Sequence, residues 1–341
     1  MACLNSTHLL TREATSAVTV PDSRSFRTYD PVAIANYYRW RIWGTSWRVI
    51  QIFWWLGTFV LGLQLDRWFK QENRNKLRRA AQLRQVLTNL GPTFIKVGQA
   101  LSTRPDLVRK DFLEELTKLQ DQLPPFPTDL ARSIIESELD YTPEEVFSVI
   151  SPAPVAAASL GQVYKARLFS GEEVAVKVQR PNLRPVLTRD LYLMRWAAGW
   201  LGKFLPLNLC HDLTLIVDEF GIKLFEEIDY LHEGRNAERF AANFKDDATV
   251  KVPKIYWRYC SERVLTLEWI DGIKLTDTER IQAAGLNIDS LIEIGVVAGL
   301  RQLLEFGFFH ADPHPGNLFA MADGRMAYID FGMMDQLPQE L

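Results

Sequence analysis

Cysteine is scarce in this sequence, and its placement excludes two classes of protein. Cys3, Cys210 and Cys260 are far apart and odd in number, and none belongs to a CxxC pair. This pattern argues against a disulfide framework or a zinc knuckle and indicates free thiols in a reducing compartment. A basic excess is also missing, since the formal net charge is −3. Nucleic-acid-binding domains usually carry a clear positive excess, so we expect no nucleic acid partner.

The N-terminus has few acidic residues. The first 30 residues contain several Ser, Thr and Arg and show no apolar period. Such a composition is typical of an organelle transit peptide, but the segment is short for one and lacks the apolar run of a secretory signal. We therefore interpret residues 1–45 as a mobile N-terminal tail, with import targeting as the alternative.

One apolar stretch, residues 49–65, contains no charged side chain. Its 17 residues fall short of the roughly 20 that a membrane-spanning helix needs. Tryptophan and tyrosine gather at its N-terminal end, where an aromatic belt would lie. We favour a helix lying in the lipid headgroup region, ahead of a helix packed on the protein's own core and of a true span. Residues 46–70 are accordingly interpreted as an apolar membrane-interacting segment.

The rest of the chain changes from helical to mixed character near Val155. Residues 71–150 show apolar positions at helical spacing, and Gly91-Pro92 is expected to end the first of these helices. Beyond Val155, two strands joined by a Ser170-Gly171 turn are predicted. Further helices are expected over 183–205, 213–244 and 281–306, with short strands between them. The sequence therefore predicts an α+β fold.

The segment HADPHPGNLF carries the first chemical motif. Asp312 and Asn317 are five residues apart, the spacing of a kinase catalytic loop, in which the Asp accepts the substrate proton and the Asn holds magnesium. His310 and His314 could suggest a zinc site. Such a pair needs helical geometry, which Pro313 and Pro315 prevent, so we interpret His310 as a structural residue.

Asp330, thirteen residues after Asn317, begins the segment DFG. A carboxylate at the end of a strand, followed by Phe-Gly, matches the magnesium-binding element of kinases. The tripeptide alone is a weak signal, but its interval from the catalytic loop makes it a specific one. We therefore expect Asn317 and Asp330 to be magnesium ligands.

Two segments upstream fit the phosphate-binding side of such a site. Lys177, in VAVKV, stands where the kinase lysine contacts the α- and β-phosphates. The segment AAASLGQV aligns with the glycine-rich loop, with alanines in place of the first two glycines. The residues expected to line the nucleotide are Ala156, Ala157, Ala158, Ser159, Gly161 and Val163.

A helical glutamate should pair with Lys177. The segment FEEIDYLHEGRNAERF offers Glu226, Glu227, Asp229 and Glu233. Glu227 and Asp229 do not share a helix face, so spacing leaves Glu226 and Glu233 as the alternatives.

Together these segments resemble the UbiB/AarF (ADCK-type) family of atypical kinase-like proteins, from about Asp30 to the C-terminus. The residues that carry the resemblance are KVGQ, AAAS, EID followed by EGRNAERF, HADPHPGN and DFG. It implies a two-lobe kinase-like fold: a helical extension over 71–150, an N-lobe over 151–270 and a partial C-lobe over 271–341. Because family members continue further, we expect this chain to be C-terminally truncated.

The resemblance also implies site roles. Lys96 and Gln99 belong to a KxGQ element that covers the acceptor side of the active site. Glu227 and Asp229 match an ExD motif, with Glu227 paired to Lys96, and Glu233 becomes the partner of Lys177. The backbone of Glu268, Trp269 and Ile270 is expected to meet adenine.

The function implied is Mg-dependent ATP chemistry supporting membrane lipid or prenylquinone metabolism. The expected cofactors are ATP and Mg2+, and the expected partners are a membrane lipid or prenylquinone and quinone-biosynthesis proteins. The location implied is a membrane facing the cytoplasm or an organelle interior. The alternatives are a nucleotide-gated scaffold with little turnover, or a kinase for proteins or small molecules; the KVGQ extension argues against a choline-kinase type.

Overall fold

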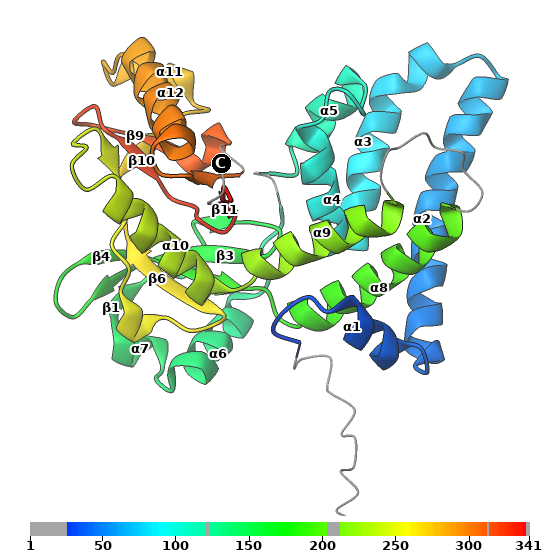
Figure 1. Cartoon of the computed structure of the whole chain (residues 1–341), viewed down its shortest axis with the longest axis horizontal. Helices are drawn as coiled ribbons and strands as arrows, with labels where there is room; N and C mark the ends of the chain where they lie inside the picture. Colours follow the sequence, from blue (N-terminus) through cyan, green and yellow to red (C-terminus); the bar gives the residue numbers. More distant parts are fainter. Residues whose placement is uncertain (1–25, 121–122, 203–211, 312–313, 339–341) are drawn as a thin grey trace, which may run out of the picture.

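The computed structural model describes residues 26–120, 123–202, 212–311 and 314–338. Its two halves are a helical unit and a mixed helix and sheet unit, and helices α8 (Leu183–Leu201) and α9 (Leu213–Glu227) run from one to the other (Figure 1). Asp312, Cys3 and Cys210 lie outside the described residues.

The N-terminal segment is ordered further upstream than expected. Asp30 caps helix α1 (Pro31–Tyr38) by accepting the Val32 and Ala33 N–H groups, each at 2.9 Å. Ile34 of α1 is buried among apolar side chains of α8 and α9. Residues 31–45, which the sequence analysis assigned to the N-terminal tail, thus include α1 and the start of the next helix, because their apolar side chains have a core to join.

The helical unit contains α2 (Ile42–Trp68), α3 (Glu72–Leu90), α4 (Pro92–Ser102) and α5 (Lys110–Thr117). As expected, Gly91 ends α3, with a φ of 92° that favours glycine. One face of α2 packs on the other three helices through Phe59 and its neighbours. The opposite face is exposed, with 92% of Trp43 and 67% of Trp54 accessible.

Among the described residues, α2 alone is long and apolar enough to cross a membrane by length and composition. Only 17% of its most apolar stretch is buried inside the protein. One face of the helix thus belongs to the protein core, and the other is exposed.

The N-lobe sheet has the order β1–β3–β4–β6, with β2 paired to β3. Val174, Val176 and Val178 of β4 are fully buried, and they pack against a helix that the sequence assigned to the extension, α6. Residues 128–150 therefore pack with the sheet, although the sequence analysis assigned them to the extension. The bounds are α6 Thr128–Leu139, α7 Pro143–Val146, β1 Phe147–Ile150, β2 Ala156–Ala157, β3 Gly161–Leu168, β4 Glu173–Gln179 and β6 Val264–Glu268.

Two expected helices are each interrupted once. The helix predicted over 213–244 becomes α9 and α10 (Tyr230–Asn243), because the Asp229 carboxylate accepts the Leu231 and His232 N–H groups and caps a new helix. The helix predicted over 281–306 becomes α11 (Thr278–Ala283) and α12 (Ile288–Leu304). Gly285 has a φ of 74°, and Asn287 caps α12.

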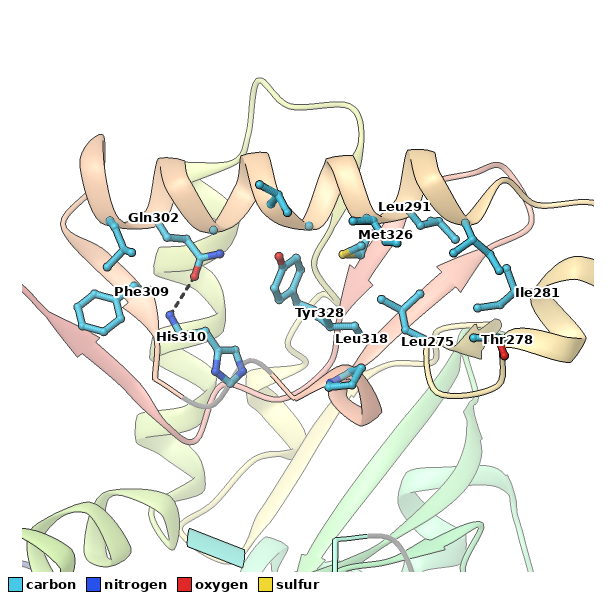
Figure 2. Close-up of a pocket in the computed structure, with 17 residues that line it drawn as sticks. Leu275, Thr278, Ile281, Leu291, Gln302, Phe309, His310, Leu318, Met326 and Tyr328 are labelled. Carbon is cyan, nitrogen blue, oxygen red and sulfur yellow. Dashed lines mark hydrogen bonds between the residues drawn. The ribbon is translucent and has the colours of Figure 1, made fainter. Parts of the chain in front are cut away.

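The C-lobe core joins α10 and α12 to short strands, with Phe240, Tyr328 and Phe331 in contact. Beneath α12 lies an apolar cavity of about 520 Å³, lined by Leu291, Met326 and other residues (Figure 2). The remaining elements are β5 Val250–Lys251, η1 Trp257–Tyr259, β7 Gly272–Lys274, β8 Phe308–His310, η2 Pro315–Asn317, β9 Leu318–Met321, β10 Met326–Tyr328 and β11 Met334–Gln336.

Candidate nucleotide and magnesium site

A cleft of about 730 Å³ lies between the N-lobe sheet, the C-lobe strands and helix α4. It gathers nearly all of the site residues predicted from the sequence. Those lining it are Lys96, Gln99, Ala156, Ala157, Ala158, Ser159, Gly161, Val163, Lys177, Glu227, Glu233, Glu268, Trp269, Ile270, Asn317 and Asp330. Asp229 is not among them, and the structure does not describe Asp312.

Lys177 and Glu233 form an ion pair at the back of the cleft. Lys177 comes from β4, whose register places it opposite Val163 of β3 and Leu265 of β6. Glu233 comes from the first turn of α10, and only 5% of its side chain is exposed. Of the two glutamates that spacing left open, the structure brings Glu233 to the lysine.

Burial governs the charges in this cluster. It raises the pKa of Glu233 to about 7, against the opposing effect of the Lys177 ammonium. Burial also disfavours the Lys177 ammonium, yet Glu233 and Asp330 together raise its pKa. Burial acts to raise the pKa of Asp330 too, but Lys177 and the Gly332 N–H lower it to about 2. Asp330 is therefore an anion across the physiological range.

Backbone contacts fix Asp330 and the residues after it. The Asp330 carboxylate accepts the Gly332 N–H at 3.0 Å and lies 4.0 Å from the Lys177 ammonium. His310 holds the same segment, since its Nε2 lies 2.9 Å from the Asp330 carbonyl oxygen. The His310 backbone N–H donates to the Gln302 side-chain oxygen on α12 at 2.9 Å (Figure 2). His310 is thus structural, as the sequence indicated.

The donor set suits magnesium better than zinc. Asn317 and Asp330 line the same cleft, and an amide oxygen with an ionised carboxylate are the hard ligands that Mg2+ takes from proteins while keeping waters and phosphate oxygens. Within the described part of the chain, no group of three or more His, Cys, Asp or Glu is placed to hold a metal. A magnesium ion shared with a nucleotide does not need one.

Helix α4 closes one side of the cleft. Lys96 forms an ion pair with Glu227 at the end of α9, with 15% and 18% of the two side chains exposed. Gln99 donates to the Leu119 carbonyl oxygen at 2.8 Å and so holds the following linker. Asp229, two residues after Glu227, caps α10 and thereby sets the position of Glu233.

The alanine segment makes a tight hairpin at the front of the cleft. Ala156 pairs with Val163, and the Ala158 N–H donates to the Gly161 carbonyl oxygen at 2.8 Å. A Cβ at Gly161 would lie 2.4 Å from the Tyr230 hydroxyl and 2.7 Å from the Val178 carbonyl oxygen. Glycine is therefore required at 161, although its φ is unremarkable, because the loop lies directly on α10 and β4.

Arg180 is a residue that the sequence analysis missed. Its Nε and Nη2 donate to the Ala158 carbonyl oxygen at 3.2 and 3.1 Å, and Nη2 donates to the Pro124 carbonyl oxygen at 2.7 Å. It thereby ties the alanine hairpin to the linker from the extension. Its place three residues after Lys177 was visible, but nothing in the sequence showed which carbonyl groups it would reach.

The segment expected to meet adenine follows β6. The Trp269 N–H donates to the Glu173 carbonyl oxygen at 3.0 Å. The Glu268 carboxylate accepts from Lys251 at 2.7 Å and from the Lys254 N–H at 3.0 Å. Because the Glu268 and Trp269 N–H groups both donate within the protein, a backbone contact with adenine would use the carbonyl groups of these residues or the Ile270 N–H.

Comparison with known proteins identifies the relatives of this architecture. Residues 118–341 match the ABC1 atypical kinase-like domain. The chain belongs to the ABC1 atypical kinase-like family. This confirms the predicted resemblance to UbiB/AarF proteins and the α+β kinase-like two-lobe fold.

Several known proteins are similar over most of the chain. Protein slr1919 of Synechocystis sp. is 68% identical, covering 92% of this chain and 55% of its own length. The chloroplastic ACTIVITY OF BC1 COMPLEX KINASE 1 of Arabidopsis thaliana is 50% identical, covering 92% and 47%. The Rv3197–erythromycin complex from Mycobacterium tuberculosis superposes with a TM-score of 0.55 and 32% identity, covering 76% and 66%. The chain spans about half the length of the curated relatives it matches.

Proposed function

We propose that this ABC1 chain binds Mg-ATP in the cleft and carries out phosphoryl chemistry that supports membrane lipid or prenylquinone metabolism. The observation that carries the proposal is the convergence of Lys177, Glu233, Asn317 and Asp330 on one cleft from separate elements. Bound Mg-ATP would supply the phosphoryl group. The chain's own residues would hold and orient it.

Each residue has a distinct task in this proposal. Lys177, held in place by Glu233, would contact the α- and β-phosphates. Asn317 and Asp330 would hold magnesium. The alanine hairpin would cover the phosphates and the backbone of residues 268–270 would meet adenine. Asp312, assigned from the sequence, would orient the acceptor or a water molecule.

The acceptor side distinguishes this cleft from an open protein kinase site. Lys96 enters the cleft beside Glu227, and Gln99 holds the linker that follows α5. An ammonium and a helix in this position would restrict access by a protein substrate. This favours hydrolysis, or transfer to a small acceptor, over free protein kinase activity.

The test is a titration with Mg-ATP, followed by thermal unfolding and phosphate release. Wild type should be stabilised by about 2.7 kcal/mol at a ligand concentration one hundred times Kd. Asp330→Asn should lose that effect, whereas Asp335→Asn, a matched change in β11 outside the cleft, should retain it. Stabilisation without phosphate release would favour the nucleotide-gated scaffold. No response in any variant would refute the nucleotide site.

The exposed face of α2 supports the membrane part of the proposal. Trp43, Trp47 and Phe53 are 92%, 65% and 70% exposed, on a helix that has no charged residue over positions 49–65. Such an apolar aromatic face is suited to the boundary between lipid headgroups and acyl chains. Relatives named as chloroplastic point to an organelle as the location. We propose that α2 lies on a lipid surface there, close to prenylquinones and their biosynthetic proteins.

A further inference from the structure

A buried carboxylate joins three helices away from the cleft. Asp190 of α8 has a fully buried side chain. Its two oxygens accept from Arg48 of α2, with Nε at 2.8 Å and Nη2 at 2.7 Å. Thr93 of α4 donates to the same carboxylate at 3.0 Å. One anion therefore receives donors from both α2, whose outer face is exposed, and α4, the helix that carries Lys96.

Arg48 has further contacts besides its ion pair with Asp190. Its Nη2 also donates to the Leu90 carbonyl oxygen, at the end of α3, and its guanidinium lies 5.7 Å from the Phe94 ring centroid. Leu90 and Thr93 flank the Gly91-Pro92 turn that starts α4. The contacts of Arg48 and Asp190 thus surround the point at which α4 begins.

Helix α4 is short enough for one end to set the position of the other. It has eleven residues, and Lys96 lies three positions after Thr93. Side chains three apart lie on neighbouring parts of one helix face. Displacing the first turn of α4 would therefore displace the Lys96 ammonium from Glu227.

We propose that Arg48 and Asp190 are positioning residues for Lys96. Through their contacts, the position of α2 determines how closely α4, and with it the Lys96 ammonium, is held against the cleft. The inference rests on the proposed function, because it assigns a regulator to the same site. The proposed role of Arg48 and Asp190 adds a physical connection between the exposed apolar face of α2 and the acceptor side of the cleft.

Stabilisation of the fold does not by itself explain the buried ion pair of Arg48 and Asp190. Buried ion pairs cost desolvation, and apolar residues of similar volume often replace them without loss. A bidentate guanidinium instead fixes direction, because its donors must meet the carboxylate and a carbonyl group together. Helix α2 also offers a matched control: Asp66 pairs with Arg79 of α3, with 8% and 13% of the side chains exposed. The other hydrogen-bond partners of this pair, Asn75 and Gln82, also lie on α3, and neither Asp66 nor Arg79 lines the cleft.

The first experiment measures the acylation rate of Lys96 by acetic anhydride, resolved by mass spectrometry, and needs no nucleotide. Lys118 in the same extension serves as the internal reference. In Arg48→Met and Asp190→Asn, Lys96 should be acylated about fivefold faster than in wild type, because freeing α4 exposes the amine. In Arg79→Met, the rate should match wild type.

A double variant separates positioning from stability. Arg48→Met combined with Asp190→Leu should recover the wild-type unfolding temperature, because an apolar pair fills the site without buried charge. Lys96 should nevertheless stay about fivefold more reactive, since the Leu90 carbonyl oxygen has lost its donor and the Thr93 hydroxyl has lost its acceptor. Return of Lys96 to its wild-type rate would mean that the network only stabilises the fold.

The second experiment measures Mg-ATP hydrolysis. Arg48→Met and Asp190→Asn should shift kcat and KM in the same direction as Lys96→Ala, and neither should add to Lys96→Ala when combined with it. The inference is overturned if Lys96 reactivity is unchanged in both variants, or if Arg79→Met raises it equally. Absence of nucleotide binding by wild type would refute the proposed function alone, because the acylation result would still stand.

Discussion

Glu233 accepts a hydrogen bond from Lys177, and it is the more deeply buried partner, with 5% of its side chain exposed against 17%. Desolvation therefore acts on both groups and raises the pKa of the carboxyl group. The pair also contacts the DFG segment, since the Phe331 N–H lies 3.5 Å from the same carboxylate oxygen.

The first prediction concerns pH. Burial raises the pKa of Glu233 from 4.5 to about 7, so the folded protein binds this proton more tightly than the unfolded chain. The resulting stabilisation is fully present below pH 4.5 and is lost as pH rises to 7. The free energy of unfolding of the magnesium-free protein should therefore fall over this range relative to that of Glu233→Gln. Urea denaturation at several pH values measures the difference. Parallel curves for the two proteins would contradict the prediction.

Arg180→Met tests the anchoring of the alanine hairpin. The change removes the donors to the Ala158 and Pro124 carbonyl oxygens while keeping a long apolar stem. We expect the Kd for Mg-ATP to rise about tenfold, equivalent to about 1.4 kcal/mol, because the loop over the phosphates loses its preorganisation. Isothermal titration would measure it. Arg167→Met, which removes an exposed arginine from the same sheet, should leave Kd unchanged.

Gly98 in the KVGQ motif should be required for packing. A Cβ there would lie 2.5 Å from Leu119 and 2.8 Å from Leu87. Gly98→Ala should therefore cost about 1–3 kcal/mol of stability through overpacking. Gly57→Ala in α2 is the matched control, because nothing lies within 4 Å of its added methyl group. It should stabilise the helix by about 0.5–1 kcal/mol. Equal stability changes in chemical denaturation would argue against close packing at Gly98.

Replacing the exposed aromatic residues of α2 tests the membrane contact. Trp43→Ser combined with Trp47→Ser should weaken binding to anionic phospholipid vesicles at least about tenfold, because both rings lose apolar contact with lipid. The thermal shift with Mg-ATP should be retained. Vesicle flotation is the measurement, and Trp257→Ser, on the η1 turn, is the control. Undiminished flotation of the α2 variant would place the membrane contact elsewhere.

Much of the site could be predicted because kinase chemistry constrains spacing. The order of Lys177, Asn317 and Asp330 along the chain was sufficient to place them in one cleft. Glu233 required the family resemblance, since spacing alone did not separate it from Glu226. The structure separates them because Asp229 starts a new helix and turns Glu233 toward Lys177.

Long-range contacts of single side chains could not be predicted. Arg180 looked like any basic residue after a strand, and Arg48 like a charge flanking an apolar stretch. Their roles depend on partners 56 and 142 residues away. Likewise, α1 was missed because its apolar side chains acquire meaning only from α8 and α9.

The two buried ion pairs of α2 have a consequence for how the molecule would diffuse. Arg48 and Asp66 are 18 residues apart, about 27 Å along a helix, and both hold the inner face of α2 to the protein. A helix fixed at two points cannot turn its axis across a bilayer on its own. On the proposed lipid contact, the whole molecule would therefore lie flat on one leaflet. Encounters with lipid-dissolved substrates would then become a two-dimensional search within that leaflet.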